Sequence, residues 1–171
     1  MRLRWGFLAL FAVFLPGLSL AQGQPPGQAA TRIQSDQLQH DDQRQVTIFS
    51  GNVSLTRDGL VLRGDRLELT QRPDGSSLAT LIGRPAQFTQ QRMGSSDRIQ
   101  GASGRLEYDS KSEIVVLLGS AQLRRIQGER TLDEVIGDQV TYNMPTETYA
   151  VKTTPGQGRA QMTLMPRGAK P

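Results

Sequence analysis

Few residues of this 171-residue sequence could do chemistry, and the most suggestive cluster is His40, Asp41 and Asp42. Imidazole and carboxylate groups are common metal ligands and also act as acid and base. However, adjacent residues on a strand point to opposite faces, and His40 is the only histidine. We therefore expect a solvated turn here and no metal site.

Nucleophilic and acid–base catalysis find little support elsewhere in the chain. There is no cysteine, and a single histidine is a poor basis for a Ser-His-Asp triad. Carboxylates could pair between Asp133 and Glu134. They could also pair between Glu68 and Glu107, but we expect both pairs on polar faces as surface charge. The sequence predicts a protein that is not an enzyme and has no cofactor.

Phosphate-binding motifs are equally weak. The Gly-Gln-Gly segment at residues 156–158 lacks the third glycine and the following helix of a dinucleotide site. The chain has no Gly-x-x-x-x-Gly-Lys loop either. Any process driven by nucleotide hydrolysis would have to take its energy from a partner.

The amino-terminal segment is typical of a secretory signal peptide. Arg2 and Arg4 precede an apolar run over residues 7–15. Ser19-Leu20-Ala21 then provides a small-x-small cleavage site. We predict that residues 1–21 are removed, with an uncleaved signal anchor as the alternative.

The rest of the chain is predicted to form one domain with short unstructured ends. Residues 22–30 are polar and rich in Pro and Gly, as expected of a flexible leader. Residues 167–171 are expected to form a disordered tail for the same reason. The domain then covers residues 31–166. Without cysteine it has no disulfides and no lipoprotein anchor, so it must fold by packing and strand pairing.

Charge and aromatic content argue against nucleic acid as a partner. Loss of Arg2 and Arg4 with the signal peptide lowers the formal net charge from +4 to +2. Five aromatic residues then remain, too few for base stacking along a strand. They are Phe49, Phe88, Tyr108, Tyr142 and Tyr149.

The strongest structural signal is alternation of apolar and polar residues with a period of two. It occurs in Val53-Ser54-Leu55, Leu67-Glu68-Leu69, Leu106-Glu107-Tyr108 and Met162-Thr163-Leu164. Helical spacing is not sustained anywhere after the signal peptide. We therefore predict an all-β fold of repeated antiparallel strands.

An internal repeat organises these strands. Units open at residues 36, 65, 104 and 138, and the first three lead to glycines at 51, 83 and 119. These glycines are expected to mark bends or bulges where a strand crosses between two facing sheets. The terminal strands resemble ordinary repeat members without caps, which predicts open edges and head-to-tail association.

The inward face of the repeat is expected to be aliphatic, and two interpretations stay open. It is either a packed core or a groove that shelters acyl chains, at about 0.8 kcal/mol for each buried methylene. The inward residues predicted by the alternation are Val53, Leu55, Leu67, Leu69, Phe88, Leu106, Tyr108, Val116, Leu123, Val140 and Tyr142. Glutamines on these strands, such as Gln90, are expected to point outward.

Five segments, together with the signal peptide, point to a known family. They are Ile33-Gln34-Ser35-Asp36-Gln37, Phe49-Ser50-Gly51-Asn52-Val53, residues 83–88, Gly101-Ala102-Ser103 and residues 115–121. Over about residues 31–166 the chain resembles the LptA/OstA family. The resemblance implies an open, slightly twisted β-jellyroll in the periplasm that binds the lipid A part of lipopolysaccharide (LPS).

The same resemblance implies partners and a site. Copies would join head to tail between inner-membrane LptC with LptB/F/G and outer-membrane LptD/E. Ile33, Phe88 and Tyr108 match the family's lipid-contacting interior, and we add Phe49 to the inward residues named above as lining of an acyl groove. Two other functions stay open: a polymerising β-repeat protein without lipid, and the soluble domain of an LptC-like exporter component.

Overall fold

A computed structural model describes residues 30–91, 94–156 and 158–166. These residues form strands, turns and bends, so the predicted all-β class is confirmed. Within them no helix is long and apolar enough to cross a membrane. The signal peptide 1–21, residues 22–29 of the leader and the tail 167–171 lie outside the described residues, and these assignments stay predictions.

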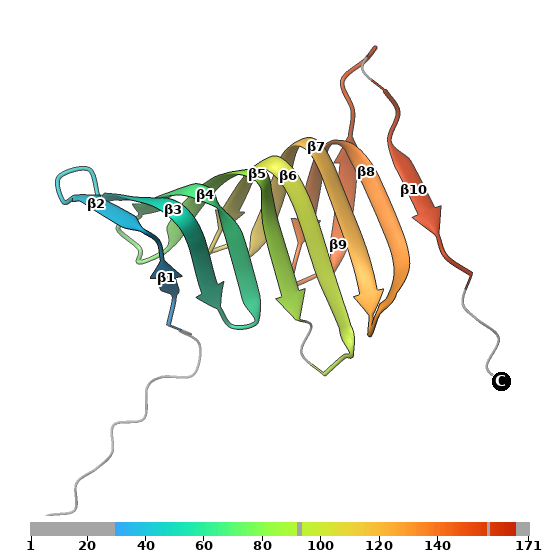
Figure 1. Ribbon diagram of the computed structural model, residues 1–171, viewed down its shortest axis with the longest axis horizontal. Helices are drawn as coiled ribbons and strands as arrows, with labels where there is room; N and C mark the ends of the chain where they lie inside the picture. Colours follow the sequence, from blue (N-terminus) through green and yellow to red (C-terminus); the bar gives the residue numbers. More distant parts are fainter. Residues whose placement is uncertain (1–29, 92–93, 157, 167–171) are drawn as a thin grey trace, which may run out of the picture.

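One antiparallel sheet contains all of the strands (Figure 1). Six long central strands, β3 to β8, pair in sequence order, and two short strands pair with the outermost long strand at each end. The strands are β1 (Arg32–Gln34), β2 (Gln37–Asp41), β3 (Val46–Arg57), β4 (Leu60–Gln71), β5 (Ser77–Gln91), β6 (Asp97–Asp109), β7 (Ile114–Gln127), β8 (Arg130–Asn143), β9 (Thr148–Lys152) and β10 (Gln161–Leu164).

Tight turns impose the antiparallel order. Between β3 and β4 the chain reverses through Asp58 and Gly59, whose φ angles are 43° and 77°. Two successive left-handed residues fit a two-residue type I′ turn. Asp-Gly is among its preferred sequences because glycine has no Cβ atom and the short polar side chain of aspartate tolerates a positive φ. Consecutive strands are therefore hairpin neighbours, as expected of repeated antiparallel strands.

Each long strand bends near its middle, where the pairing register shifts. In the pairing of β3 with β4 the shift lies between Ser50 and Val53, and in the pairing of β7 with β8 it lies between Leu118 and Ala121. Gly51 and Gly119 have φ angles of 79° and 76°, which explains why glycine occurs there. The prediction that these glycines mark bends is confirmed.

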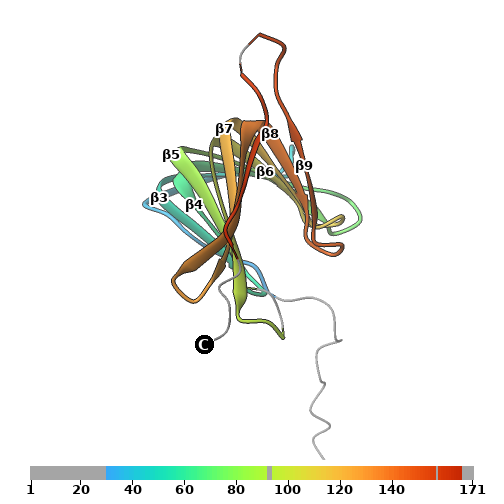
Figure 2. The ribbon, with the colours of Figure 1, turned by 90° about the vertical axis from the view of Figure 1, so that its right-hand side faces the viewer.

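The bends fold the sheet over on itself (Figure 2). We expected two facing sheets, but the strands run through the bends, so both layers belong to one sheet. We call the layers the first and second walls. The first wall contains residues 46–50, 66–71, 77–82, 105–109, 114–118 and 139–143 with β2 and β9, and the second contains residues 53–57, 60–63, 86–91, 97–102, 121–127 and 130–137 with β1 and β10.

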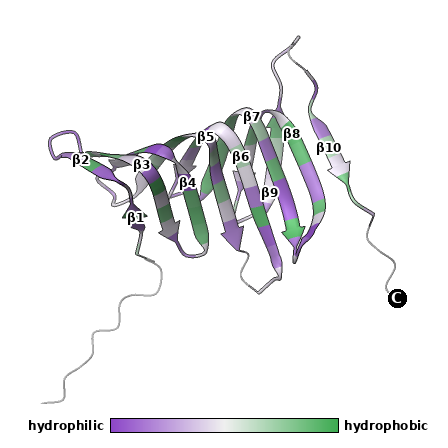
Figure 3. Cartoon of the chain, viewed as in Figure 1, coloured by the Kyte–Doolittle hydropathy of each residue, from purple (hydrophilic) through white to green (hydrophobic). Residues whose placement is uncertain are grey.

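The core lies between the walls. Apolar and polar residues alternate along the strands (Figure 3), and the apolar set faces inward. Leu62, Leu67, Leu81, Leu106 and Leu117 are completely buried there. The two walls thus share one continuous hydrophobic core.

Candidate functional site

The inner face brings together most of the residues predicted to line it. Phe49, Val53, Leu55, Leu67, Phe88, Leu106, Tyr108, Leu123, Val140 and Tyr142 are buried in one cluster. Ile33 and Leu69 are partly buried and pack against this cluster. Their inward orientation is therefore observed, whereas a role in binding lipid stays a prediction.

Val116 was placed on the wrong face. Val115 and Leu117 are completely buried, and Val116 between them is only half-buried. Successive strand residues point to opposite sides, so Val116 lies on the outer face. Residues 114–118 are all apolar, and such a run carries no polar residue to fix the phase of the alternation.

The inner face contains further residues that the alternation did not predict. Leu60 and Leu62 flank the apolar Val61, so only the polar Arg63 on the other face indicated which way they point. Small residues such as Ala86 carry no comparable signal. The missed members of the cluster are Leu60, Leu62, Ala79, Leu81, Ala86, Ile99, Val115, Leu117, Ala121, Val135 and Met144.

Two predictions about polar residues were also wrong. Gln90 was expected to point outward, but it pairs with Leu60 and Ile99 on the inner face, and its Oε1 atom is buried. Asp133 was expected on a polar face, yet only 8% of it is exposed. It is paired with Arg125 inside the fold.

The middle of the interior is filled by aromatic rings from both walls. Phe88 of the second wall stacks on Tyr142 of the first, with ring centroids 6.1 Å apart and an interplanar angle of 29°. Tyr108 is also buried, and this desolvation raises the pKa of its phenol. The walls are therefore in direct contact, and a guest between them would have to displace these side chains.

Glycine at position 101 creates the space for one of these rings. A Cβ atom at Gly101 would lie 2.2 Å from Cε1 of Phe88 and 2.9 Å from Cδ1 of Leu117. Phe88 belongs to the second wall and Leu117 to the first. The Phe88 ring thus occupies the volume that a side chain at position 101 would need.

The inner face is uncovered at both ends of the sheet. Leu38 of β2 pairs with Phe49 and is 59% exposed at the amino-terminal end. Met162 and Leu164 of β10 pair with Val135 and Asp133 at the carboxy-terminal end, and they are 53% and 68% exposed. Cross-strand partners share a face, so the apolar interior continues to both edges of the sheet.

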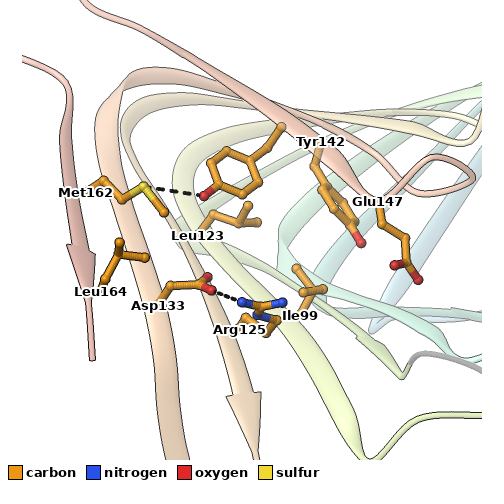
Figure 4. A pocket seen from close by; sticks show the side chains of 9 residues that line it. Ile99, Leu123, Arg125, Asp133, Tyr142, Glu147, Met162 and Leu164 are labelled. Atoms are coloured by element: carbon orange, nitrogen blue, oxygen red, sulfur yellow. Dashed lines mark hydrogen bonds and ion pairs between the residues drawn. The ribbon is translucent and has the colours of Figure 1, made fainter. Parts of the chain in front are cut away.

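At the carboxy-terminal end this face lines a cavity of about 210 Å³, the carboxy-terminal mouth. Figure 4 shows its side chains, which come from both walls. The Tyr149 hydroxyl of β9 donates to Sδ of Met162 in β10 at 3.8 Å, which links the last strands of the two walls. The mouth is lined by Ile99, Leu123, Arg125, Asp133, Tyr142, Glu147, Tyr149, Met162 and Leu164.

Charged residues stabilise the turns at the rim of the first wall. Nη2 of Arg72 donates to Asp109 at 2.8 Å, and this hydrogen bond lowers the pKa of Asp109 to about 2. Nζ of Lys111 donates to Asp74 at 2.7 Å and holds the pKa of that carboxyl well below its usual range. These bonds tie the β4–β5 turn to the β6–β7 turn.

The His40 cluster shows no catalytic or metal-binding arrangement. His40 and Asp41 end strand β2, and Asp42 follows in an exposed turn. Nδ1 of His40 lies 2.8 Å from the Thr47 hydroxyl, a cross-strand hydrogen bond. Among the described residues no three His, Cys, Asp or Glu side chains are grouped to hold a metal ion.

Comparison with known proteins assigns the fold to a family. Residues 32–148 match the sequence profile of the family described as LptA/(LptD N-terminal domain) LPS transport protein. The lipopolysaccharide export system protein LptA of Escherichia coli K12 is 28% identical over 137 residues, covering 78% of this chain and 70% of that protein. LptH of Pseudomonas aeruginosa is 26% identical over 160 residues, 88% of each chain.

A solved structure has the same architecture. It is the crystal structure of LptH, described as the LptA homologous periplasmic component of the conserved lipopolysaccharide transport device from Pseudomonas aeruginosa. The TM-score is 0.71 at 23% identity, over 80% of this chain and 96% of that one. The profile match covers well over half of the sequence, and the family consists of transport proteins and not of enzymes. This chain therefore belongs to the LptA/LptD N-terminal-domain family of LPS transport proteins.

Proposed function

We propose that this protein is a periplasmic LPS carrier that shelters the acyl chains of lipid A between its two walls. The supporting observation is the inner face, which is apolar along every long strand and uncovered at both ends. Each methylene that moves from water into such a surface contributes about 0.8 kcal/mol. The sugar head group stays in water beside the turn-bearing rims.

Passage of a lipid requires the walls to separate. The interior is filled by the protein's own side chains, and Phe88 and Tyr142 are in contact across it. Acyl chains would take the place of these contacts, so apolar surface remains covered with and without the guest. This exchange keeps the free-energy cost of separating the walls low and favours a flexible ligand such as an acyl chain.

Strand direction supports head-to-tail association of copies. Every neighbouring pair in the sheet is antiparallel, so β10 runs opposite to β1 when the two ends of successive copies meet. The same holds for β9 and β2. Joining β10 to β1 and β9 to β2 continues both walls without reversing the antiparallel order.

Such a joint also continues the apolar face. Ile33 of β1 pairs with Leu55 on the inner side, and Met162 of β10 pairs with Val135 on the same side. The next copy would therefore bring Ile33 beside Met162 and cover edge strands that are otherwise open. We propose that the outermost copies meet inner-membrane LptC with LptB/F/G at one end and outer-membrane LptD/E at the other.

Site-specific photo-crosslinking in living cells tests the carrier function. A photoreactive residue at position 88 is expected to yield an adduct that an LPS blot detects. Gln87 is the matched control because it is the adjacent residue on the outer face and is exposed. No adduct at position 88, in a protein that still forms end-to-end oligomers, would favour a polymerising scaffold without lipid.

The exporter-component alternative needs a different measurement. An LptC-like soluble domain would keep its amino-terminal anchor, whereas a free carrier loses residues 1–21. Amino-terminal sequencing of the protein from cells is expected to begin at Gln22. A chain that begins at residue 1 would instead support the anchored component.

A further inference from the structure

An ion pair interrupts the apolar interior at the carboxy-terminal mouth. Arg125 of β7 and Asp133 of β8 are register partners, and Nη2 of Arg125 donates to Oδ2 of Asp133. Asp133 is 8% exposed, and the pair lies among Ile99, Leu123 and Leu164 (Figure 4). Removing the Asp133 carboxylate from water is costly, and replacing a buried ion pair by apolar side chains is often neutral or stabilising. Fold stability alone therefore does not account for the pair.

The guanidinium has hydrogen-bonding capacity to spare. Arginine has five N–H donors, and Nε of Arg125 is buried without a hydrogen-bond partner. About a third of the side chain is exposed, and it borders the cavity. An oxygen-rich anion such as a phosphate group fits this fork, because arginine binds phosphate through parallel N–H donors.

We propose that Arg125 is an anion site for the phosphate group of an amphiphile whose chains lie on the apolar interior, and that Asp133 competes with that phosphate for the guanidinium. This inference rests on the proposed carrier function. When the mouth is empty, Asp133 neutralises Arg125. When a phosphate arrives, it takes over part of the guanidinium fork.

The competition explains how such a site could release its ligand. A guanidinium without a competing carboxylate would hold a phosphate tightly and stop transport. Asp133 offers an alternative partner within the same mouth, and Glu147 on the opposite side adds a second negative charge. These carboxylates repel a phosphate, so the head group is bound only transiently.

The neighbouring residues supply a matched control. Arg124 and Glu134 are also register partners, and Nε of Arg124 lies 2.6 Å from Oε1 of Glu134. They belong to the same two strands but face outward, since adjacent strand residues point to opposite sides. Neutralising Arg124 or Glu134 changes the net charge by the same amount as neutralising Arg125 or Asp133, but leaves the side chains of the mouth unchanged.

The test measures binding of two amphiphiles with the same chain, dodecyl phosphate and the uncharged dodecyl maltoside, by titration calorimetry. Arg125→Gln is expected to weaken dodecyl phosphate binding about tenfold, as loss of one charge-assisted hydrogen bond does. Asp133→Asn is expected to tighten it by a similar factor. The affinity for dodecyl maltoside should be unchanged in both variants. The control variants Arg124→Gln and Glu134→Gln should bind both amphiphiles as the unaltered protein does.

The outcomes separate this inference from the carrier function. Binding of both amphiphiles with no effect of Arg125→Gln would overturn the anion site and leave the carrier intact. Failure of both amphiphiles to bind the unaltered protein would overturn the carrier function itself. Equal effects of the outer pair would show that only net charge matters and would also overturn the site.

A measurement on the unaltered protein covers the case in which a variant fails to fold. The Arg125 Nε–H resonance, assigned by NMR, is expected to shift with dodecyl phosphate and not with dodecyl maltoside. Inorganic phosphate at the same concentration should leave it in place. An equal shift with inorganic phosphate would identify a free-phosphate site and overturn the assignment to a lipid head group.

Discussion

The rings of Phe88 and Tyr142 stack across the interior, 6.1 Å apart, and join the two walls of a single folded sheet. Phe88 comes from the second wall and Tyr142 from the first. Their contact makes the interior a packed core in this structure, and the proposed lipid path runs through the same residues. Stability and transport therefore depend on one set of side chains.

Gly101 is expected to tolerate no larger side chain while Phe88 is present. Gly101→Ala places a Cβ atom 2.2 Å from the Phe88 ring, and overpacking of this kind costs about 1–3 kcal/mol of the free energy of unfolding. Urea denaturation measures this loss. The Phe88→Leu change should relieve part of it in the double variant, whereas additive losses would contradict the contact.

The two faces of β7 should respond differently to truncation. Leu117→Ala removes completely buried methyl groups and should lower the free energy of unfolding by about 2–5 kcal/mol. Val116→Ala acts on the outer face, where the expected loss is below about 1 kcal/mol. Thermal denaturation of both variants checks the prediction, and a larger loss at Val116 would reverse the assignment of the faces.

Acid should weaken the rim of the first wall. The hydrogen bond from Arg72 lowers the folded-state pKa of Asp109 to about 2, below its unfolded value. The stability from this carboxylate is present above the unfolded pKa and is lost as the pH falls from about 4 toward 2. Asp109→Asn should flatten the pH dependence of the melting temperature over that interval, and an unchanged profile would contradict the role of this ion pair.

Removal of β10 should separate association from folding. All side chains of Gln161–Leu164 are exposed, so deletion of residues 161–171 removes little of the core. It also removes the edge that we propose to pair with β1 of the next copy. Because β9 remains for the other half of the joint, sedimentation velocity should show smaller oligomers than the full chain forms, with the circular dichroism spectrum retained. Oligomers of undiminished size would place the joint elsewhere.

The alternation of apolar and polar residues was sufficient to predict the all-β class and about half of the residues that line the interior. Alternation in segments such as Val53-Ser54-Leu55 predicts strands with one apolar face, and the glycines at 51 and 119 mark bends because left-handed backbone favours glycine. These signals depend on backbone geometry within a few residues. The sequence resemblance added the family, which the profile match confirms over residues 32–148.

Which residues of a strand point inward was decided in some segments only by the tertiary structure. In the all-apolar run at 114–118 no polar residue distinguishes the two faces, and Val116 was placed inside for that reason. Gln90 and Asp133 are polar but lie on the inner face, Gln90 opposite Leu60 and Asp133 buried beside Arg125. Polarity alone could not assign them.

The sequence by itself thus determined an all-β repeat with glycine bends and the family to which it belongs, because strand periodicity and turn preferences are local. Only the tertiary structure decided that the two walls are one sheet, that Phe88 meets Tyr142, and that Arg125 meets Asp133 inside the mouth. Phe88 and Tyr142 are far apart in the chain, and their contact exists because every long strand bends at the same level of the sheet. Glycine marks single bends locally, but the alignment of the bends across the sheet comes from strand pairing and is not encoded in any single segment.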